Sequence, residues 1–270
     1  MRVGAPSINM PELPEVEYAT GVLRLAVLGK TLARILTPHN SFARRLPRPK
    51  ARLAEGHRVV SVERRGKHQI ISLGNNVVIV AHFRLDGDWK VETSDDPMAK
   101  FARAAMEFTD GTRVALVDFR ALATLAVYRS TEKYLPALGP DPTDPALDVD
   151  AVCTAFARRN ISVKQALLDQ KILAGVGNIY AAEALWLAKI DPRVSGNALG
   201  TGRCRQLVQA LRRVLAAGDR ASSRYRSAPS GRLRVYDREG KPCRRCRALI
   251  KRITQGTRST YFCEGCQLRR

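Results

Sequence analysis

Four cysteines near the C-terminus have the residue type and the spacing of a metal site. They form the pattern C-x2-C-x16-C-x2-C, and the ligands would be Cys243, Cys246, Cys263 and Cys266. Each close pair can place two thiolates on one ion, and four thiolates complete the closed tetrahedron of a structural zinc site. Two disulfides or an iron–sulfur cluster are the alternatives. The spacer is basic and hairpin-like, so the sequence favours a zinc-bound β-hairpin that takes no part in chemistry.

A second candidate site lies in "MPELPEVE", residues 10–17, where carboxylates gather around Pro11. Glu12 follows Pro11 directly, and Glu15 lies one helical turn further on. Carboxylates can serve as general acids or bases, but acidic residues at a helix N-terminus also complement the helix dipole. At this point both interpretations of Glu12 and Glu15 stay open.

A glycine turn in "LLDQKILAGVGNIYAAEAL" (167–185) separates two helical patterns. Gly175 and Gly177 allow a tight turn of the backbone, and Asn178 is a suitable N-cap for the helix that follows. The exposed N–H groups at the start of that helix would suit a phosphate. The G-x-G-N pattern alone is weak, because an ordinary helix–turn–helix in a core is the default interpretation.

The charge of the chain indicates a polyanionic partner. Across 270 residues, 46 Lys and Arg stand against 25 Asp and Glu, a net charge of +21, and the pI is about 10.4. The last forty residues hold twelve Lys or Arg against three Asp or Glu. Such an excess releases counterions when it meets phosphates, and we prefer this interpretation to a solvated basic surface.

Composition also limits the class of protein. A hydrophobic share of 45% supports ordinary cores, and no apolar run is long enough to span a membrane. The first nine residues have no apolar core of the kind that a secretory signal needs. We therefore expect a soluble, intracellular protein.

The N-terminal half of the chain has the pattern of β-structure, on which the helix that begins near the carboxylates would pack. Residues 56–130 are short β-branched segments, and the turn signals between them include Asp86-Gly87 and Asp110-Gly111, both strong hairpin signals. We expect an antiparallel sandwich or barrel. An amphipathic helix that starts near Pro11 or Pro14 would pack against it.

In the C-terminal half, the apolar residues recur with the period of helices instead of strands. Residues 135–150 are rich in proline and aspartate and are expected to be a linker, and residues 151–217 have helical patterns. Cys153 and Cys204 stand alone in these helical segments, and we expect them to be packing residues with inert thiols.

Together these motifs resemble the formamidopyrimidine-DNA glycosylase / endonuclease VIII family of base-excision repair enzymes. Four segments match in the family's order: residues 10–17, "RRGKHQI" (64–70), residues 167–185 and the cysteine hairpin. The resemblance implies an α+β multidomain fold, with an N-terminal antiparallel β-sandwich and flanking helix, a helix–two-turns–helix domain and a C-terminal zinc-bound β-hairpin. DNA would bind in the cleft between the domains.

The resemblance also implies domain boundaries. The N-terminal catalytic domain would comprise residues 10–134, the linker 135–150, the helix–two-turns–helix domain 151–230 and the zinc finger 231–270. Residues 1–9 would be a leader that is absent from the mature protein.

The catalytic roles implied by the resemblance start at Pro11. In the family, the proline after the initiator methionine becomes the N-terminus, and its secondary amine attacks C1′ of the damaged nucleotide. Glu12 matches the acid that protonates the sugar ring oxygen, and Glu15 would support the site. Lys67 matches the hairpin lysine, which the tight Gly66 turn would direct at the lesion phosphate.

Further positions match DNA-binding residues of the family. Asn178 matches its phosphate-binding asparagine, and Arg258 matches the zinc-finger arginine that grips phosphates beside the extruded nucleotide. Leu85, Arg120 and Leu122 match the side chains that fill the gap left by the flipped base.

The gap-filling set departs from the family pattern. Leu85 stands where many members have methionine, and Leu122 replaces the phenylalanine of a "DPRRFG" motif. The segment 221–232 is also shorter than the one that covers 8-oxoguanine in many purine-specific members. We therefore expect oxidised pyrimidines, formamidopyrimidines or a broad range of lesions as substrates.

The function expected from the resemblance is that of a bifunctional DNA glycosylase and abasic-site lyase. The Pro11 nitrogen is a nucleophilic amine only if translation starts at Met10 or the leader is removed. A non-catalytic damaged-DNA-binding protein on the same scaffold is the alternative, and a zinc-finger regulator is disfavoured because Pro11, Glu12 and Lys67 would have no purpose in it.

The expected partner is damaged double-stranded DNA and the expected cofactor one structural Zn2+. We expect no membrane association and no small-molecule cofactor. The protein would act as a monomer in the cytoplasm, associated with the nucleoid.

Overall fold

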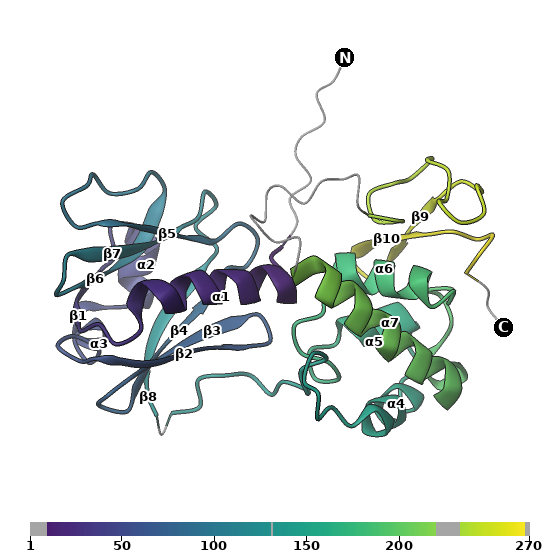
Figure 1. Ribbon diagram of the computed structural model, residues 1–270, viewed down its shortest axis with the longest axis horizontal. Helices are drawn as coiled ribbons and strands as arrows, with labels where there is room; N and C mark the ends of the chain where they lie inside the picture. The colour runs from purple at the N-terminus through teal and green to yellow at the C-terminus, as the bar shows by residue number, and fades with distance from the viewer. Residues whose placement is uncertain (1–9, 131, 220–232, 268–270) are drawn as a thin grey trace, which may run out of the picture. The chain divides into compact units, whose positions relative to one another are not determined.

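A computed structural model describes residues 10–130, 132–219 and 233–267. These residues form two compact units (Figure 1). The first comprises residues 16–136 together with Met10 and Pro11, and the second comprises residues 137–267 together with residues 12–15. Helix α1 (Leu13–Val27) therefore begins among residues of the second unit and continues among those of the first.

Two antiparallel four-stranded sheets build the first unit. One sheet has the strand order β1-β6-β7-β5 and the other β2-β3-β4-β8. The strands are β1 (Leu32–Leu36), β2 (Val59–Arg65), β3 (His68–Leu73), β4 (Val77–His82), β5 (Asp88–Thr93), β6 (Ala102–Phe108), β7 (Thr112–Val117) and β8 (Thr124–Arg129). Two short helices, α2 (Asn40–Arg45) and α3 (Arg48–Ala51), follow β1.

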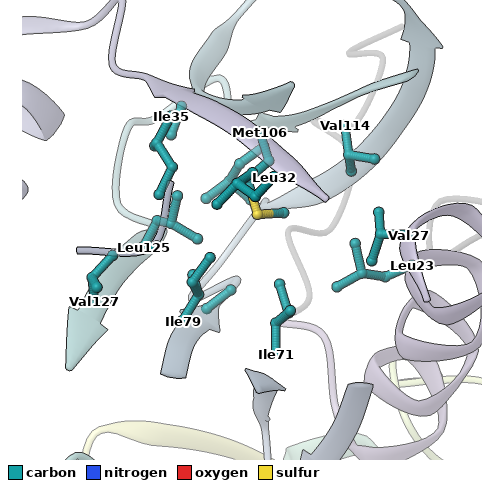
Figure 2. Packing of buried hydrophobic residues seen from close by; sticks show 14 of the residues in the cluster. Leu23, Val27, Leu32, Ile35, Ile71, Ile79, Met106, Val114, Leu125 and Val127 are labelled. Carbon is teal, nitrogen blue, oxygen red and sulfur yellow. The ribbon is translucent and has the colours of Figure 1, made fainter. Parts of the chain in front are cut away.

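One apolar core joins the two sheets and α1. Figure 2 shows side chains from all three pointing into the same space, and each buried side chain of this size contributes about 1.5–3 kcal/mol to stability. The labelled members are Leu23, Val27, Leu32, Ile35, Ile71, Ile79, Met106, Val114, Leu125 and Val127. The amphipathic helix predicted from the N-terminal pattern is confirmed, with Pro14 in its first turn.

The two Asp-Gly signals have different outcomes. Asp110-Gly111 joins β6 and β7, which pair as predicted for a hairpin. The hairpin prediction at Asp86-Gly87 is wrong, because the strands on either side, β4 and β5, belong to different sheets. Here Gly87 lies against Phe83, and a Cβ at position 87 would come within 2.8 Å of the Phe83 Cα, so the glycine serves a close crossing between sheets.

Four helices and a short 3-10 turn form the core of the second unit. They are α4 (Val149–Ala157), α5 (Val163–Leu168), α6 (Asn178–Leu187), the 3-10 helix η1 (Gly196–Ala198) and α7 (Thr201–Asp219), which agree with the helical patterns of the sequence. One prediction for this half is wrong. Cys153 in α4 and Cys204 in α7 form a disulfide with a Cα–Cα distance of 5.7 Å, so they are not separate packing thiols.

An antiparallel hairpin completes the second unit. Strands β9 (Lys251–Gln255) and β10 (Arg258–Phe262) pair with each other, and β10 lies against α6. The predicted fold class is therefore confirmed: a β-sandwich with a helix, a helical unit and a hairpin that carries four cysteines. Within the described ranges, no helix has the length and apolar character needed to cross a membrane.

Candidate active site and nucleic-acid interface

The start of α6 is built around the carboxylate of Glu12. Its Oε1 accepts a hydrogen bond from the backbone N–H of Ile179 (2.8 Å), and its Oε2 accepts one from Tyr180 (3.2 Å). Glu12 is 3% exposed. A carboxylate at a helix N-terminus is stabilised by the unpaired N–H groups and by the helix dipole.

This arrangement corrects two expectations for Asn178. The N-cap of α6 is Gly177, and Asn178 is the first helical residue, because Glu12 rather than the Asn178 side chain satisfies the first N–H groups. The same N–H groups are therefore not open to a phosphate. The Asn178 amide instead donates to the carbonyl of Ser259 in β10 (3.1 Å).

The two glycines of the turn make room for residues 12 and 13. A Cβ at Gly177 would lie 2.1 Å from the Glu12 Cδ, and one at Gly175 would lie 2.7 Å from the Leu13 Cδ1. Gly175 also has a φ of +88°, which disfavours other residues. The backbone of Leu13 donates to the Gly175 carbonyl (3.1 Å), so the glycine pattern holds the N-terminal segment.

Glu15 binds the same segment and helix α6 through its two carboxylate oxygens. Its Oε2 accepts a hydrogen bond from the Glu12 backbone N–H (3.0 Å), and its Oε1 accepts one from the Tyr180 hydroxyl (2.7 Å). Glu12 and Glu15 are thus both fixed on the first turn of α6, and neither side chain is a loosely solvated surface charge.

A buried lysine that sequence reasoning missed links this region to the hairpin. Lys164 on α5 is 1% exposed, and its Nζ donates to the Ser259 carbonyl (2.8 Å) and the Thr260 hydroxyl (2.7 Å). Burial lowers the pKa of Lys164 to about 7; the carboxylate of Glu12 opposes this shift, and the charge of Arg258 adds to it. The sequence does hold one sign of this buried lysine, because Lys164 lies among the apolar residues of α5.

Arg258 itself is exposed at the first position of β10, directly after the turn that contains Gly256. Lys164 and Asn178 both bind the backbone of the next residue, Ser259. The hairpin arginine is therefore carried on a strand that α5 and α6 hold in place.

The four predicted metal ligands come together at the base of the hairpin. Their Sγ atoms all lie within 4.8 Å of one another, and none is disulfide-bonded. A tetrahedral zinc thiolate site needs this spacing, and four thiolates fit zinc. The ligands are Cys243, Cys246, Cys263 and Cys266.

Helix α6 supports the cysteine cluster through residues that sequence reasoning missed. The indole Nε1 of Trp186 donates to the Cys243 sulfur (3.4 Å), and the guanidinium of Arg245 stacks on the indole at 3.9 Å. The buried carboxylate of Glu183 accepts hydrogen bonds from the backbone N–H groups of Val235 (2.9 Å) and Tyr236 (3.0 Å), which lead into the hairpin.

The remaining predicted residues lie in the first unit. Pro11 is buried and lies two residues before the first residue of α1, Leu13. Lys67 lies in the turn between β2 and β3, directly after Gly66. The φ of Gly66 is +60°, which fits the tight turn that the sequence predicts there. Arg64 holds this turn, because it donates to the Gly66 carbonyl (3.1 Å) and pairs with Glu17 of α1 (2.5 Å).

Two histidines lie beside Lys67 on β3 and β4. The rings of His68 and His82 meet edge to face at 4.7 Å. Burial lowers the pKa of His82 to about 3, and the nearby charges of His68, Arg84 and Lys67 lower it further. The pKa of His68 is lowered as well, chiefly by burial, so both imidazoles are neutral near pH 7.

The predicted gap-filling residues lie on two loops. Leu85 is half-buried between β4 and β5, whereas Arg120 and Leu122 are exposed between β7 and β8. The predictions about segment 221–232 and about leader residues 1–9 concern parts of the chain outside the described residues.

Three protein-family models match this chain, and together they cover most of its residues. The N-terminal domain model of formamidopyrimidine-DNA glycosylase matches residues 10–125, and the H2TH domain model of the same enzyme matches residues 138–226. The zinc finger found in this enzyme and in isoleucyl-tRNA synthetase matches residues 240–269.

Relatives and solved structures agree with these matches. The formamidopyrimidine-DNA glycosylase of Novosphingobium aromaticivorans is 36% identical over 96% of this chain and 100% of its own, and that of Bacillus licheniformis is 33% identical over 96% and 99%. The Lactococcus lactis enzyme, solved non-covalently bound to DNA with an abasic site, is 28% identical with a TM-score of 0.87, covering 95% of this chain and 99% of its own.

A sandwich, an H2TH helical unit and a four-cysteine hairpin on one chain define a DNA repair glycosylase with a DNA-binding fold. The chain belongs to the formamidopyrimidine-DNA glycosylase family.

Proposed function

We propose that this protein is a bifunctional DNA glycosylase and abasic-site lyase that removes oxidised bases from duplex DNA. Pro11, freed as an N-terminus, attacks C1′ of the damaged nucleotide with its secondary amine, and the base leaves as an iminium forms. Loss of a proton from C2′ then expels the 3′ phosphate and cuts the strand. The three catalytic residues are Pro11, Glu12 and Lys67.

The observation that supports this proposal most is the way Glu12 is held. Its carboxylate is buried and bound by two backbone N–H groups of α6, and it belongs to the residue directly after Pro11. An acid that must protonate the sugar ring oxygen gains from such positioning, because little motion is needed in the transition state. Glu15 supports it through the backbone N–H of Glu12.

Borohydride trapping on DNA with an abasic site tests the proposal. A protein that begins at Met10, with the methionine removed, is expected to form a covalent adduct, whereas the intact 270-residue form gives none because its Pro11 nitrogen is an amide. Glu12→Gln should slow removal of a damaged base more than cleavage of a ready-made abasic site. Trapping by neither form would favour the second candidate, a damaged-DNA-binding protein that does not cut.

DNA binding is assigned to residues of both units. We propose that Asn178 and Arg258 contact phosphates and that Leu85, Arg120 and Leu122 fill the gap in the duplex. Affinity should fall steeply with salt, as counterion release requires for a chain of charge +21.

A matched pair of arginine variants tests the phosphate contact. Arg258→Ala should weaken binding to damaged DNA by roughly 1–3 kcal/mol, the scale of a lost charge-assisted hydrogen bond. Arg205→Ala removes an exposed arginine that already pairs with Asp150 (2.7 Å), so its effect should be smaller. Equal effects of the two changes would contradict the assignment of Arg258.

We also propose one structural Zn2+ held by the four clustered cysteines, which would cross-link the two ends of the hairpin. The substrates would be formamidopyrimidines and oxidised pyrimidines, and the protein would act as an intracellular monomer. The domain division into residues 10–134, 135–150, 151–230 and 231–270, with a leader of residues 1–9 absent from the mature protein, belongs to the same proposal.

A further inference from the structure

The β7–β8 loop presents an aromatic side chain to solvent. Phe119 is 63% exposed, and Phe101, before β6, is 41% exposed; they are the two exposed phenylalanines of the described residues. Their rings meet edge to face with centroids 5.1 Å apart. An aromatic ring that stays exposed can serve as a platform on which another flat ring stacks.

The backbone beneath Phe119 is rigid because one buried carboxylate organises it. Asp118 is 1% exposed and accepts hydrogen bonds from the backbone N–H groups of Arg120 (2.9 Å), Leu122 (2.6 Å) and Ala123 (2.6 Å). Ala121 between them has a φ of +55°, a conformation that is costly for a residue with a Cβ. The loop therefore has one defined shape, which is kept despite backbone strain.

A second set of contacts ties this loop to the segment before β6. Arg103 donates to the carbonyls of Asp118 (2.5 Å) and Phe119 (2.9 Å), and the backbone N–H of Asp118 donates to the Phe101 carbonyl (3.1 Å). Phe101 has a φ of +65°, a second strained position. Both chain segments are therefore held so that Phe119 stays exposed and in contact with Phe101.

The surroundings of the aromatic pair are cationic. Lys100 lies over the Phe101 ring at 5.1 Å and Arg103 at 5.8 Å, and Arg120 is exposed on the same loop. An exposed ring among Lys and Arg side chains suits a ligand that combines a flat apolar face with negative charge. A nucleobase with its phosphates has that chemistry.

We propose that Phe119 stacks on a base of the damaged duplex, beside the position that the extruded nucleotide leaves. This assignment rests on the proposed function, and it makes Phe119 a residue that determines specificity for damaged DNA. Leu122 stands where the family motif has phenylalanine, and its side chain has no π face. Phe119, three residues earlier on the same loop, supplies the aromatic ring that position 122 lacks.

The inference is tested with the protein that begins at Met10 and a duplex that carries a tetrahydrofuran abasic analogue with 2-aminopurine in the opposite strand. Phe119→Ala should weaken binding to this duplex roughly 5- to 150-fold, the range found when a stacking aromatic is truncated. Binding to an undamaged duplex should change much less, and the 2-aminopurine emission of the complex should change. Leu25→Ala, which alters a side chain 90% exposed on α1, is the matched surface control.

Two conservative variants separate stacking from apolar contact and guard against misfolding. Phe119→Trp should bind as the parent does, with its additional indole emission quenched on the abasic duplex, whereas Phe119→Leu should behave like Phe119→Ala. Equal binding by the parent and by folded Phe119→Leu, or an unquenched indole in Phe119→Trp, would overturn the inference. If the parent itself does not prefer the abasic duplex, the proposed function fails instead.

Discussion

Replacing Gly177 with alanine should displace the candidate catalytic acid, Glu12, while leaving residue 12 itself unchanged. Gly177 has φ −128° and ψ −170°, which alanine adopts freely, so the change introduces no backbone strain. The new Cβ would lie 2.1 Å from the Glu12 Cδ, far inside contact distance. The Glu12 side chain or the start of α6 must therefore move, and the hydrogen bonds to Ile179 and Tyr180 are lost.

The magnitude follows from those two hydrogen bonds. Each bond to a charged group contributes about 1.5–3 kcal/mol, so the free energy of unfolding should fall by about 3 kcal/mol or more. For a unit of this size, that corresponds to a decrease in Tm of roughly 6 to 12 °C, which calorimetry or circular dichroism can measure. Base removal should slow more than cleavage of a ready-made abasic site, because the displaced group is the proposed acid.

Two further variants make the Gly177 prediction specific. Gly202→Ala places the same methyl group on α7, where no atom lies within 4 Å, and should leave Tm unchanged or raise it slightly. Combining Gly177→Ala with Glu12→Ala removes the clashing atoms, so the double variant should be more stable than the sum of the single changes predicts. A Gly177→Ala protein that melts and excises like the parent would refute the reasoning.

Three other predictions test the support of the site. The pKa of Lys164 is lowered to about 7, so above that pH the native state holds fewer protons than the unfolded state. From pH 7 to 10 the free energy of unfolding of the parent should therefore rise by up to about 1.4 kcal/mol per pH unit relative to that of Lys164→Met. Equal pH profiles of the two proteins would contradict this. Reduction of the disulfide between Cys153 and Cys204, which closes a 51-residue separation, should cost up to about 4 kcal/mol in chemical denaturation, and insensitivity to reductant would exclude the bond. Cys263→Ser should lower the zinc content from about one ion per chain and weaken DNA binding together, and normal DNA affinity without metal would refute a structural role.

Much of the fold could be predicted because local patterns agreed with tertiary structure. The helix before Gly29, the strands from Val59 to Val117 and the four helices after residue 148 have apolar periods that match their buried faces. Strand β1 lies outside the predicted β-region of residues 56–130, because five residues carry little periodic signal. Asp86-Gly87 misled because the same dipeptide serves a crossing between sheets as well as a hairpin.

The site shows a different limit of sequence reasoning. The motif identified the right glycines, but their purpose is close packing against Glu12 and Leu13, residues more than 160 positions away in the chain. Lys164 could not be assigned from sequence, because its partners lie on β10. The link between Cys153 and Cys204 depends on the packing of α4 against α7, which no local pattern encodes.

Identification of the residue that bonds to DNA tests the central claim most directly. The protein that begins at Met10 would be trapped with borohydride on DNA with an abasic site, digested with a protease and a nuclease, and analysed by tandem mass spectrometry. The proposed mechanism predicts the sugar remnant on the nitrogen of Pro11, at the N-terminus of the peptide that contains Glu12. A remnant on the Nζ of Lys67 or another lysine, or efficient trapping by a form with residues 1–9 verified intact, would contradict it.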